Sequence, residues 1–339
     1  MTLMQQAPEF LRGVKTPRTL MLLYHRIDDL PSDPQLLAVT PEHFDQHLQV
    51  LQRRYCAQRF ADLTEASASR KVPTNSIVVT VDDGYADNLT NALPLLEKHE
   101  IPATVFVTTG IVRERKHFWW DDLARIALGE HSVPESLEIE LDKLHTYSFV
   151  EINNWCGQRS TDWNLLCEQD PTPRHRLYRE ASHFLRGASE LERARVLRNL
   201  RDWAGLPAAT ESDCNVLSVD ELTQLGRSDL IEIGSHTVHH PVLSALSLAA
   251  QEVELCESKN YLESLLDREV AGFAYPYGTK ADYTSETIAV VKTAGYKSAC
   301  SNIAEAIWPG TDPFQFPRLL VRDCDGSEFE NWLGQWFGE

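Results

Sequence analysis

Short apolar runs alternate with longer amphipathic segments along most of this chain. Seven runs rich in branched and aromatic residues predict buried strands at residues 19–25, 76–81, 103–108, 230–234, 270–275, 297–300 and 317–322. Apolar positions three and four residues apart predict helices between them, at residues 41–54, 88–99, 247–267, 283–294 and 327–337. The first of these helices has Thr40 as its N-cap and Pro41 at its first position. This alternation indicates an α/β fold with a parallel sheet and helical crossovers.

The alternation stops between residues 113 and 216. This interval opens near HFWWDD, is rich in Trp, Arg and Glu, and carries Leu185, Leu191, Val196 and Leu200 at spacings typical of partly buried helices. We therefore predict an N-terminal extension (1–17), a main α/β part (18–112 and 217–339) and a mostly helical insertion (113–216). A chain of 339 residues is long enough for one such domain with an insertion.

Two adjacent carboxylates, Asp82 and Asp83, follow the predicted strand 76–81 in the segment TVDDGYADN. Side chains alternate between faces along a regular strand, so both carboxylates can enter one pocket only where the strand loses its regularity. Gly84 permits such a break. Alone, the DDG sequence is weak evidence, because Asp and Gly are common turn residues.

A second polar cluster, GSHTVHH, follows the predicted strand 230–234 and places His236 and His240 four residues apart. One helical turn would bring two such imidazoles together. With a carboxylate such as Asp83, they would form a three-ligand site for zinc or another first-row metal, open to water and substrate. A chain with twelve histidines can also contain such a pair by chance.

The composition limits the setting in which the chain acts. A formal charge of −18 disfavours binding to nucleic acid or anionic membranes, since both attract Lys and Arg. No run of 18 apolar residues predicts a transmembrane segment, and the N-terminus lacks the apolar core of a signal peptide, so we expect a cytoplasmic protein. The seven cysteines are scattered, which is typical of reduced thiols.

Three motifs together, TVDDGY, HTVHH and FAYPYG (273–278), resemble the polysaccharide deacetylase family, the NodB-homology carbohydrate esterases of family 4 type. The likeness covers residues 19–110 and 216–323. It implies a distorted (β/α)7 barrel of the NodB-homology type, with the helical segment as an insertion. It also implies that Asp82 is the general base and that Asp83, His236 and His240 hold a divalent metal ion, with zinc preferred and cobalt, nickel, iron or manganese as alternatives.

The same resemblance assigns a substrate groove. Pro276 and Tyr277 of the proline-aromatic motif would shape it, and their loop would offer a backbone N–H to the oxyanion; we include Tyr85 among the residues expected near substrate. Trp119 and Trp120 could stack on a sugar ring, or could instead anchor the insertion, as large aromatic residues usually do.

Two departures from the family pattern affect the expected catalytic groups. Where many members carry an Arg that orients the base, this chain has Ala274 and Tyr275, and no His follows His240 to act as the late general acid. Arg318 could pair with Asp82 instead, and His25 could donate a proton to the leaving amine. The alternatives are a surface ion pair for Arg318 and a packed strand-end residue for His25.

The function expected from the resemblance is removal of an N-acetyl group from an acetamido sugar. In a cytoplasmic setting the substrate would be a glycan precursor, a lipid-linked intermediate or a nucleotide sugar. Two alternatives stay open: hydrolysis of another non-peptide C–N bond on the same barrel, and a catalytically weakened sugar-binding protein.

Overall fold

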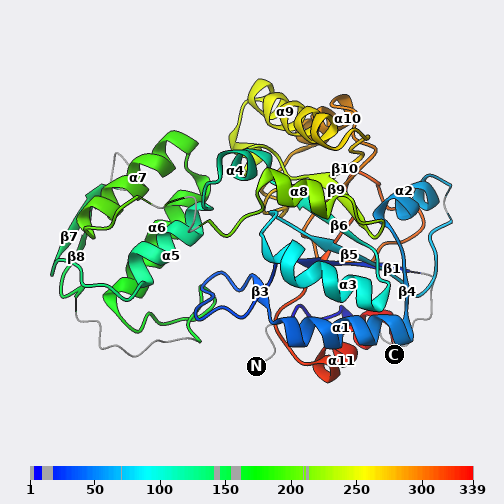
Figure 1. Cartoon of the computed structure of the whole chain (residues 1–339), viewed down its shortest axis with the longest axis horizontal. Coiled ribbons are helices and arrows are strands. Elements are labelled where there is room, and N and C mark those ends of the chain that lie inside the picture. The colour runs from blue at the N-terminus through cyan, green and yellow to red at the C-terminus, as the bar shows by residue number, and fades with distance from the viewer. Residues whose placement is uncertain are drawn as a thin grey trace. The chain divides into compact units, whose positions relative to one another are not determined.

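The computed structural model describes residues 4–9, 18–69, 71–140, 146–153, 162–208, 210 and 214–338. The chain divides into two compact units (Figure 1). The first comprises residues 1–29, 37–114 and 215–339, and the second comprises residues 30–36 and 115–214. The short segment 30–36 therefore groups with the second unit, which no sequence pattern indicated.

The first unit contains a parallel sheet that curls into a half-barrel. Its strands, in spatial order, are β11 (Ser298–Cys300), β10 (Gly272–Ala274), β9 (Ile231–Ser235), β6 (Ala103–Val107), β5 (Ser76–Val81), β1 (Thr19–Tyr24) and β12 (Leu319–Leu320). A parallel bridge between Cys300 and Phe316 links β11 to the segment before β12. The seven predicted strands are all present, and the predicted barrel fold is confirmed.

Three short strands complete this unit. β4 (Cys56–Ala57) pairs with the start of β5, and β2 (Arg26–Ile27) pairs with β3 (Ala38–Val39).

Helices follow the strands as crossovers. They are α1 (Pro41–Arg54), α2 (Phe60–Ala68), α3 (Leu93–His99), α4 (Thr109–Glu114), α8 (Val219–Leu225), α9 (Leu248–Leu266), α10 (Ser285–Thr293) and α11 (Gly326–Phe337). A π-helical turn, η2 (Asn88–Ala92), leads into α3, and a 3₁₀ turn, η4 (Leu243–Ala245), precedes α9. The five predicted helices of this part are present, whereas α2, α4 and α8, each of nine residues or fewer, had no prediction. α1 packs against α3 and α11, and α9 packs against α10 (Figure 1).

The strands are apolar on both faces because the two faces contribute to two different hydrophobic core clusters. Along β1, Leu20 and Leu22 join the larger cluster, which includes helix residues. Met21 joins a smaller cluster with Phe106 and Ala274, from β6 and β10. Buried apolar surface on both faces is what a parallel sheet covered by helices requires.

The second unit contains helices α5 (Trp119–Leu128), α6 (Pro173–Gly187) and α7 (Glu190–Trp203), and an antiparallel hairpin of β7 (Leu137–Glu140) and β8 (Thr146–Phe149). The hairpin was not predicted, because its alternation of buried Leu137 and Ile139 with exposed neighbours lasts only four residues. Within the ranges that the structure describes, no helix has the length and apolar character needed to cross a bilayer.

Candidate active site

The two neighbouring carboxylates lie where β5 ends. Asp82 continues the strand pairing, with its N–H donating to the Tyr24 carbonyl at 2.9 Å. The next two residues have left-handed backbone conformations, with φ of +78° at Asp83 and +92° at Gly84. A Cβ at residue 84 would lie 3.3 Å from Val107 Cγ1, so both the angle and the space favour glycine. This break brings both buried carboxylates close to one side chain, His236, which agrees with the convergence expected from the sequence.

The two histidines lie on a loop, not on the helical turn that their spacing suggested. β9 ends at Ser235, and the loop that follows has left-handed φ values of +67° at Thr237 and +54° at His240. The Thr237 hydroxyl accepts the His240 N–H at 3.0 Å. Glu254 of α9 accepts the N–H groups of Val238 and His239, both at 2.9 Å. The loop conformation therefore depends on α9, which the local HxxxH pattern does not include.

Asp83, His236 and His240 form a compact set of candidate metal ligands. Asp83 Oδ1 lies 3.7 Å from Nε2 of His236 and 3.5 Å from Nε2 of His240. One ligand atom from each residue falls within 4.8 Å of the other two. All three residues are buried. Two imidazoles and one carboxylate suit zinc and other first-row dications, so the side chains fit the metal ion that the resemblance implies.

The surroundings of His236 favour the metal-binding form of its ring. Nδ1 lies 2.8 Å from the Ala274 carbonyl, which can only accept, so Nδ1 carries the proton and Nε2 keeps its lone pair. Burial also lowers the pKa of His236, although Asp82 opposes this effect. The neutral imidazole is therefore the favoured state.

Arg318 pairs with Asp82 inside the barrel, as the sequence hypothesis expected. Nη1 donates to Asp82 Oδ1 and Nη2 donates to Asp82 Oδ2, each at 2.7 Å. The remaining N–H groups of the guanidinium donate to Thr80 Oγ1, the Ser301 carbonyl and Asn302 Oδ1. All five donors of a fully buried guanidinium therefore have acceptors. Arg318 therefore makes the contact with Asp82 that the sequence hypothesis proposed, in a chain that has no Arg directly before Pro276.

This pairing fixes the charge state of Asp82. Burial alone would raise the pKa of the carboxyl, but the charge and hydrogen bonds of Arg318 outweigh burial and lower the pKa below its ordinary value. Burial would likewise lower the pKa of Arg318, and Asp82 outweighs it and raises the pKa. Asp82 is therefore an ionised acceptor beside the ligand set, with Oδ2 at 3.8 Å from His236 Nε2.

His25 follows β1 and lies near the same carboxylate. Its Nδ1 is buried and makes no hydrogen bond to the residues that the structure describes. Burial lowers the pKa of His25 to about 3, although Asp82 opposes the shift. At neutral pH the ring is uncharged, so a role as proton donor requires its pKa to rise when substrate binds.

The loop after β10 carries the proline-aromatic motif. Tyr277 and Gly278 have left-handed φ values of +58° and +67°. The Tyr277 ring packs edge-on against His240, with 4.6 Å between ring centroids. The Tyr277 carbonyl accepts a hydrogen bond from Asn302, a residue that sequence reasoning missed. The available signal was its position, two residues after the end of the predicted strand 297–300.

Three aromatic residues expected near substrate are buried instead. Tyr85 is fully buried, and the Arg26 guanidinium lies over its ring at 4.6 Å from the centroid. Trp119 and Trp120 are 8% and 5% exposed within the second unit, where Trp120 stacks on Phe118 at 4.5 Å. Burial leaves little ring surface for a sugar. It corrects the expectation for Tyr85 and favours the packing role for both tryptophans.

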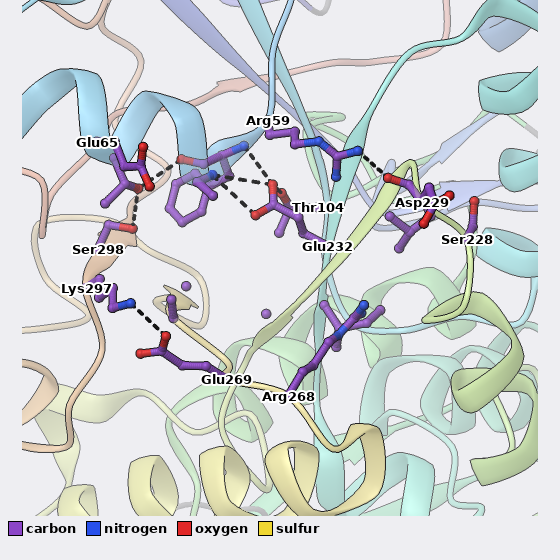
Figure 2. Close-up of a pocket in the computed structure, with 18 of the residues that line it drawn as sticks. Arg59, Glu65, Thr104, Ser228, Asp229, Glu232, Arg268, Glu269, Lys297 and Ser298 are labelled. Atoms are coloured by element: carbon purple, nitrogen blue, oxygen red, sulfur yellow. Dashed lines mark hydrogen bonds and ion pairs between the residues drawn. The ribbon is translucent and has the colours of Figure 1, made fainter.

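Figure 2 shows a separate cavity, which has a volume of about 540 Å³. Its lining includes the first residues of β9, β10 and β11, whereas the carboxylates and histidines follow the C-terminal ends of β5 and β9. Four basic and four acidic side chains line it. Several of these groups are already engaged: Lys297 pairs with Glu269 at 2.7 Å, Arg59 donates to the Asp229 carbonyl, and Glu232 accepts the Phe60 N–H. With balanced charges and no ligand set for a metal, this cavity does not compete with the strand-end site.

Known proteins share parts of this sequence and its fold. The family model described as polysaccharide deacetylase matches residues 69–162 and 203–299, more than half of the chain. A poly-beta-1,6-N-acetyl-D-glucosamine N-deacetylase of Staphylococcus aureus is 28% identical over 132 residues, which cover 37% of this chain and 43% of that protein. The chain spans half or less of the length of the curated relatives it matches.

Two solved structures share the fold. The deacetylase PplD of Streptococcus pyogenes, in complex with acetate, has a TM-score of 0.58 and 17% identity, covering 94% of this chain and 99% of that one. IcaB from Ammonifex degensii has a TM-score of 0.56 and 18% identity, covering 96% and 99%.

Proposed function

The chain belongs to the polysaccharide deacetylase family, and on this premise we propose that it is a metal-dependent hydrolase that removes the N-acetyl group from an acetamido sugar. One observation carries the proposal: three candidate ligands converge at the end of the sheet, with an ionised, arginine-bound carboxylate beside them. Amide hydrolysis needs an activated water, a polarised carbonyl, stabilisation of the oxyanion and a proton for the amine.

Asp83, His236 and His240 would hold the ion, and zinc is the metal we propose, with cobalt, nickel, iron and manganese as alternatives. When bound, a divalent ion would polarise the amide carbonyl and lower the pKa of water. Left-handed conformations at Asp83 and His240 support this role, because backbone strain at ligand positions persists only where the surroundings impose it.

Asp82 would accept the proton of the attacking water. Each carboxylate oxygen has two lone pairs, so both oxygens can bond Arg318 and still accept another proton. Arg318 would keep Asp82 ionised and fix its direction. Together they supply the oriented base that the family motif assigns to Asp82.

The loop of Pro276 and Tyr277 would stabilise the oxyanion through the Tyr277 backbone N–H. Its position beside His240 supports this role, because the oxyanion forms next to the ligand set. His25 would donate the proton to the leaving amine once substrate raises its pKa.

For the substrate class, we propose an N-acetylglucosamine-containing glycan or its precursor. The name of the Staphylococcus aureus relative, which gives poly-beta-1,6-N-acetyl-D-glucosamine as its substrate, supports this class. A lipid-linked intermediate or a nucleotide sugar follows only if the predicted cytoplasmic location holds.

The test is acetate release by zinc-loaded protein from N-acetylglucosamine oligomers, nucleotide sugars and cyclic amides. We expect release from the sugar substrates, and none from them after Asp82→Asn, which should still bind zinc because Asp82 is not in the ligand set. Asp45→Asn is the matched control and should keep wild-type turnover, because Asp45 is a half-buried carboxylate on α1 that pairs with Lys98 at 2.7 Å, outside the proposed catalytic groups. Wild-type turnover by Asp82→Asn, or release from cyclic amides alone, would contradict the proposal.

A further inference from the structure

Asn302 connects the two halves of the proposed catalytic machinery. It is the second residue after β11, is half-buried, and lies between the Arg318 guanidinium and the loop of Tyr277 and Gly278. Its side chain accepts from Arg318 Nη2 through Oδ1 at 2.7 Å and donates from Nδ2 to the Tyr277 carbonyl at 2.7 Å. Its backbone N–H donates to the Gly278 carbonyl at 2.9 Å.

The orientation of the Asn302 amide follows from its partners. A guanidinium can only donate and a carbonyl can only accept, so the amide oxygen must face Arg318 and the amide nitrogen must face Tyr277. A flipped amide would lose both bonds and place like groups against each other. The side chain is therefore held in one state.

On the first side, Asn302 completes the setting of the base. Arg318 Nη2 divides its two N–H groups between Asp82 Oδ2 and Asn302 Oδ1, both at 2.7 Å. Because Arg318 is fully buried, removing the Asn302 oxygen would leave one donor without an acceptor in a dry site. The guanidinium would then be free to tilt, and the direction of the Asp82 carboxylate would change with it.

On the other side, Asn302 holds a loop in which Tyr277 has a strained backbone conformation. Tyr277 and Gly278 both have positive φ values, and their backbone approaches Asn302 closely: a Cβ at residue 278 would lie 2.7 Å from the Asn302 nitrogen. Two hydrogen bonds from one residue, to two successive carbonyls, fix this loop. Left-handed conformations of this kind need such outside support.

We propose that Asn302 is a positioning residue that sets the separation between the base Asp82 and the oxyanion donor at Tyr277. This inference rests on the proposed deacetylase function. The base and the oxyanion donor act on the same tetrahedral centre, so their relative placement matters within about 0.5 Å. Asn302 sets that placement without touching substrate, by bonding Arg318 on one side and the loop backbone on the other.

The test uses two variants of the full chain and a control. Asn302→Ala removes both side-chain bonds, and Asn302→Asp keeps an acceptor for Arg318 but loses the donor to Tyr277. Gln58→Ala is the matched control, since Gln58 is a half-buried amide that bonds Ser76 at 2.8 Å at the opposite end of β5. Three properties are measured for each variant: the kinetics on the acetamido sugar, the zinc affinity, and the hydrogen exchange of peptides containing residues 276–278.

We expect Asn302→Ala to lower kcat by about 10- to 100-fold, with KM within about threefold of wild type. Zinc affinity should stay at the wild-type value, because no ligand is altered. Exchange at residues 276–278 should accelerate in both Asn302 variants and not in Gln58→Ala. A merely structural residue would change thermal stability and leave kcat of the folded protein unaltered.

Wild-type kcat in folded Asn302→Ala would overturn the inference. If that variant does not fold, Asn302→Asp decides on the same terms. Should the wild-type protein release no acetate, the proposed function fails, and the exchange experiment still decides the role of Asn302. Unchanged exchange at residues 276–278 in both variants would overturn the role of Asn302. Faster exchange would support the part of that role in which Asn302 holds the loop of Tyr277 and Gly278.

Discussion

The buried pair of Asp82 and Arg318 sets the electrostatics of the site at the scale of single residues. Both side chains are excluded from solvent, and a buried ion without its partner is strongly destabilising. Bidentate geometry and complete hydrogen bonding of the guanidinium offset that cost. The same bonds keep Asp82 ionised, so stability and function rest on one contact.

This pairing predicts a specific pattern of stabilities. Arg318→Met should lower the free energy of unfolding by about 3–5 kcal/mol, because it leaves the Asp82 charge buried and unpaired. Adding Asp82→Asn to that variant should recover part of the loss, since the unpaired charge is then removed. Urea denaturation of the single and double variants measures both effects. A double variant less stable than Arg318→Met alone would show that the buried charge is not the source of the loss.

At the scale of elements, the strands and helices of the first unit could be predicted because their apolar periodicity is strong and continuous. The ends of β5 and β9 could then be recognised as the place of the site. The loop of His236 and His240 could not be predicted correctly, because Glu254, eighteen residues after His236, helps to set its conformation. The pairing of Asp82 with Arg318 could be stated only as a hypothesis, because no local sequence pattern links β5 to the segment before β12.

The packing of α1 on α11 contains a buried histidine that makes stability depend on pH. His47 stacks on Phe329 with 4.0 Å between ring centroids, and its Nε2 lies 2.8 Å from the Cys324 carbonyl. Burial lowers the pKa of His47 to about 4, against an ordinary value of 6.5. The unfolded chain therefore takes up a proton at this residue, as pH falls from 6.5 toward 4, before the folded chain does.

Stability contributed by neutral His47 should be complete above pH 6.5 and decline as pH falls toward 4. The slope attributable to one such proton is about 1.4 kcal/mol per pH unit. His47→Gln cannot take up this proton, so its unfolding free energy should fall less steeply across the same interval. Urea denaturation at a series of pH values compares the two slopes. Parallel slopes for wild type and variant would contradict the prediction.

At the scale of the whole molecule, the net charge affects which glycans the protein attracts and which it repels. A formal charge of −18 creates a negative field that repels polyanions over about one Debye length, roughly 10 Å at 0.1 M salt. Neutral acetamido glycans do not experience this repulsion. Partly deacetylated glycans carry ammonium groups and would be attracted to the protein.

Ionic strength should therefore affect neutral and charged substrates differently. Salt between about 0.02 and about 0.2 M progressively screens the field of the protein. Raising the salt concentration over this range should leave kcat/KM for a neutral N-acetylglucosamine oligomer unchanged within about twofold. The same change should raise kcat/KM for a carboxylated N-acetylated glycan, because screening reduces repulsion. Equal salt dependence for the two substrates would contradict a role for the overall field.

The proposed function depends on the binding of one divalent ion by Asp83, His236 and His240, with Asp82 beside it. Anomalous diffraction at the zinc absorption edge, from crystals of zinc-loaded protein, tests this binding most directly. We predict one strong peak per chain, about 2.0–2.2 Å from Nε2 of both histidines and from an oxygen of Asp83. The peak should persist in Asp82→Asn and vanish in His240→Ala. A zinc peak elsewhere, or none between these three side chains, would contradict the account.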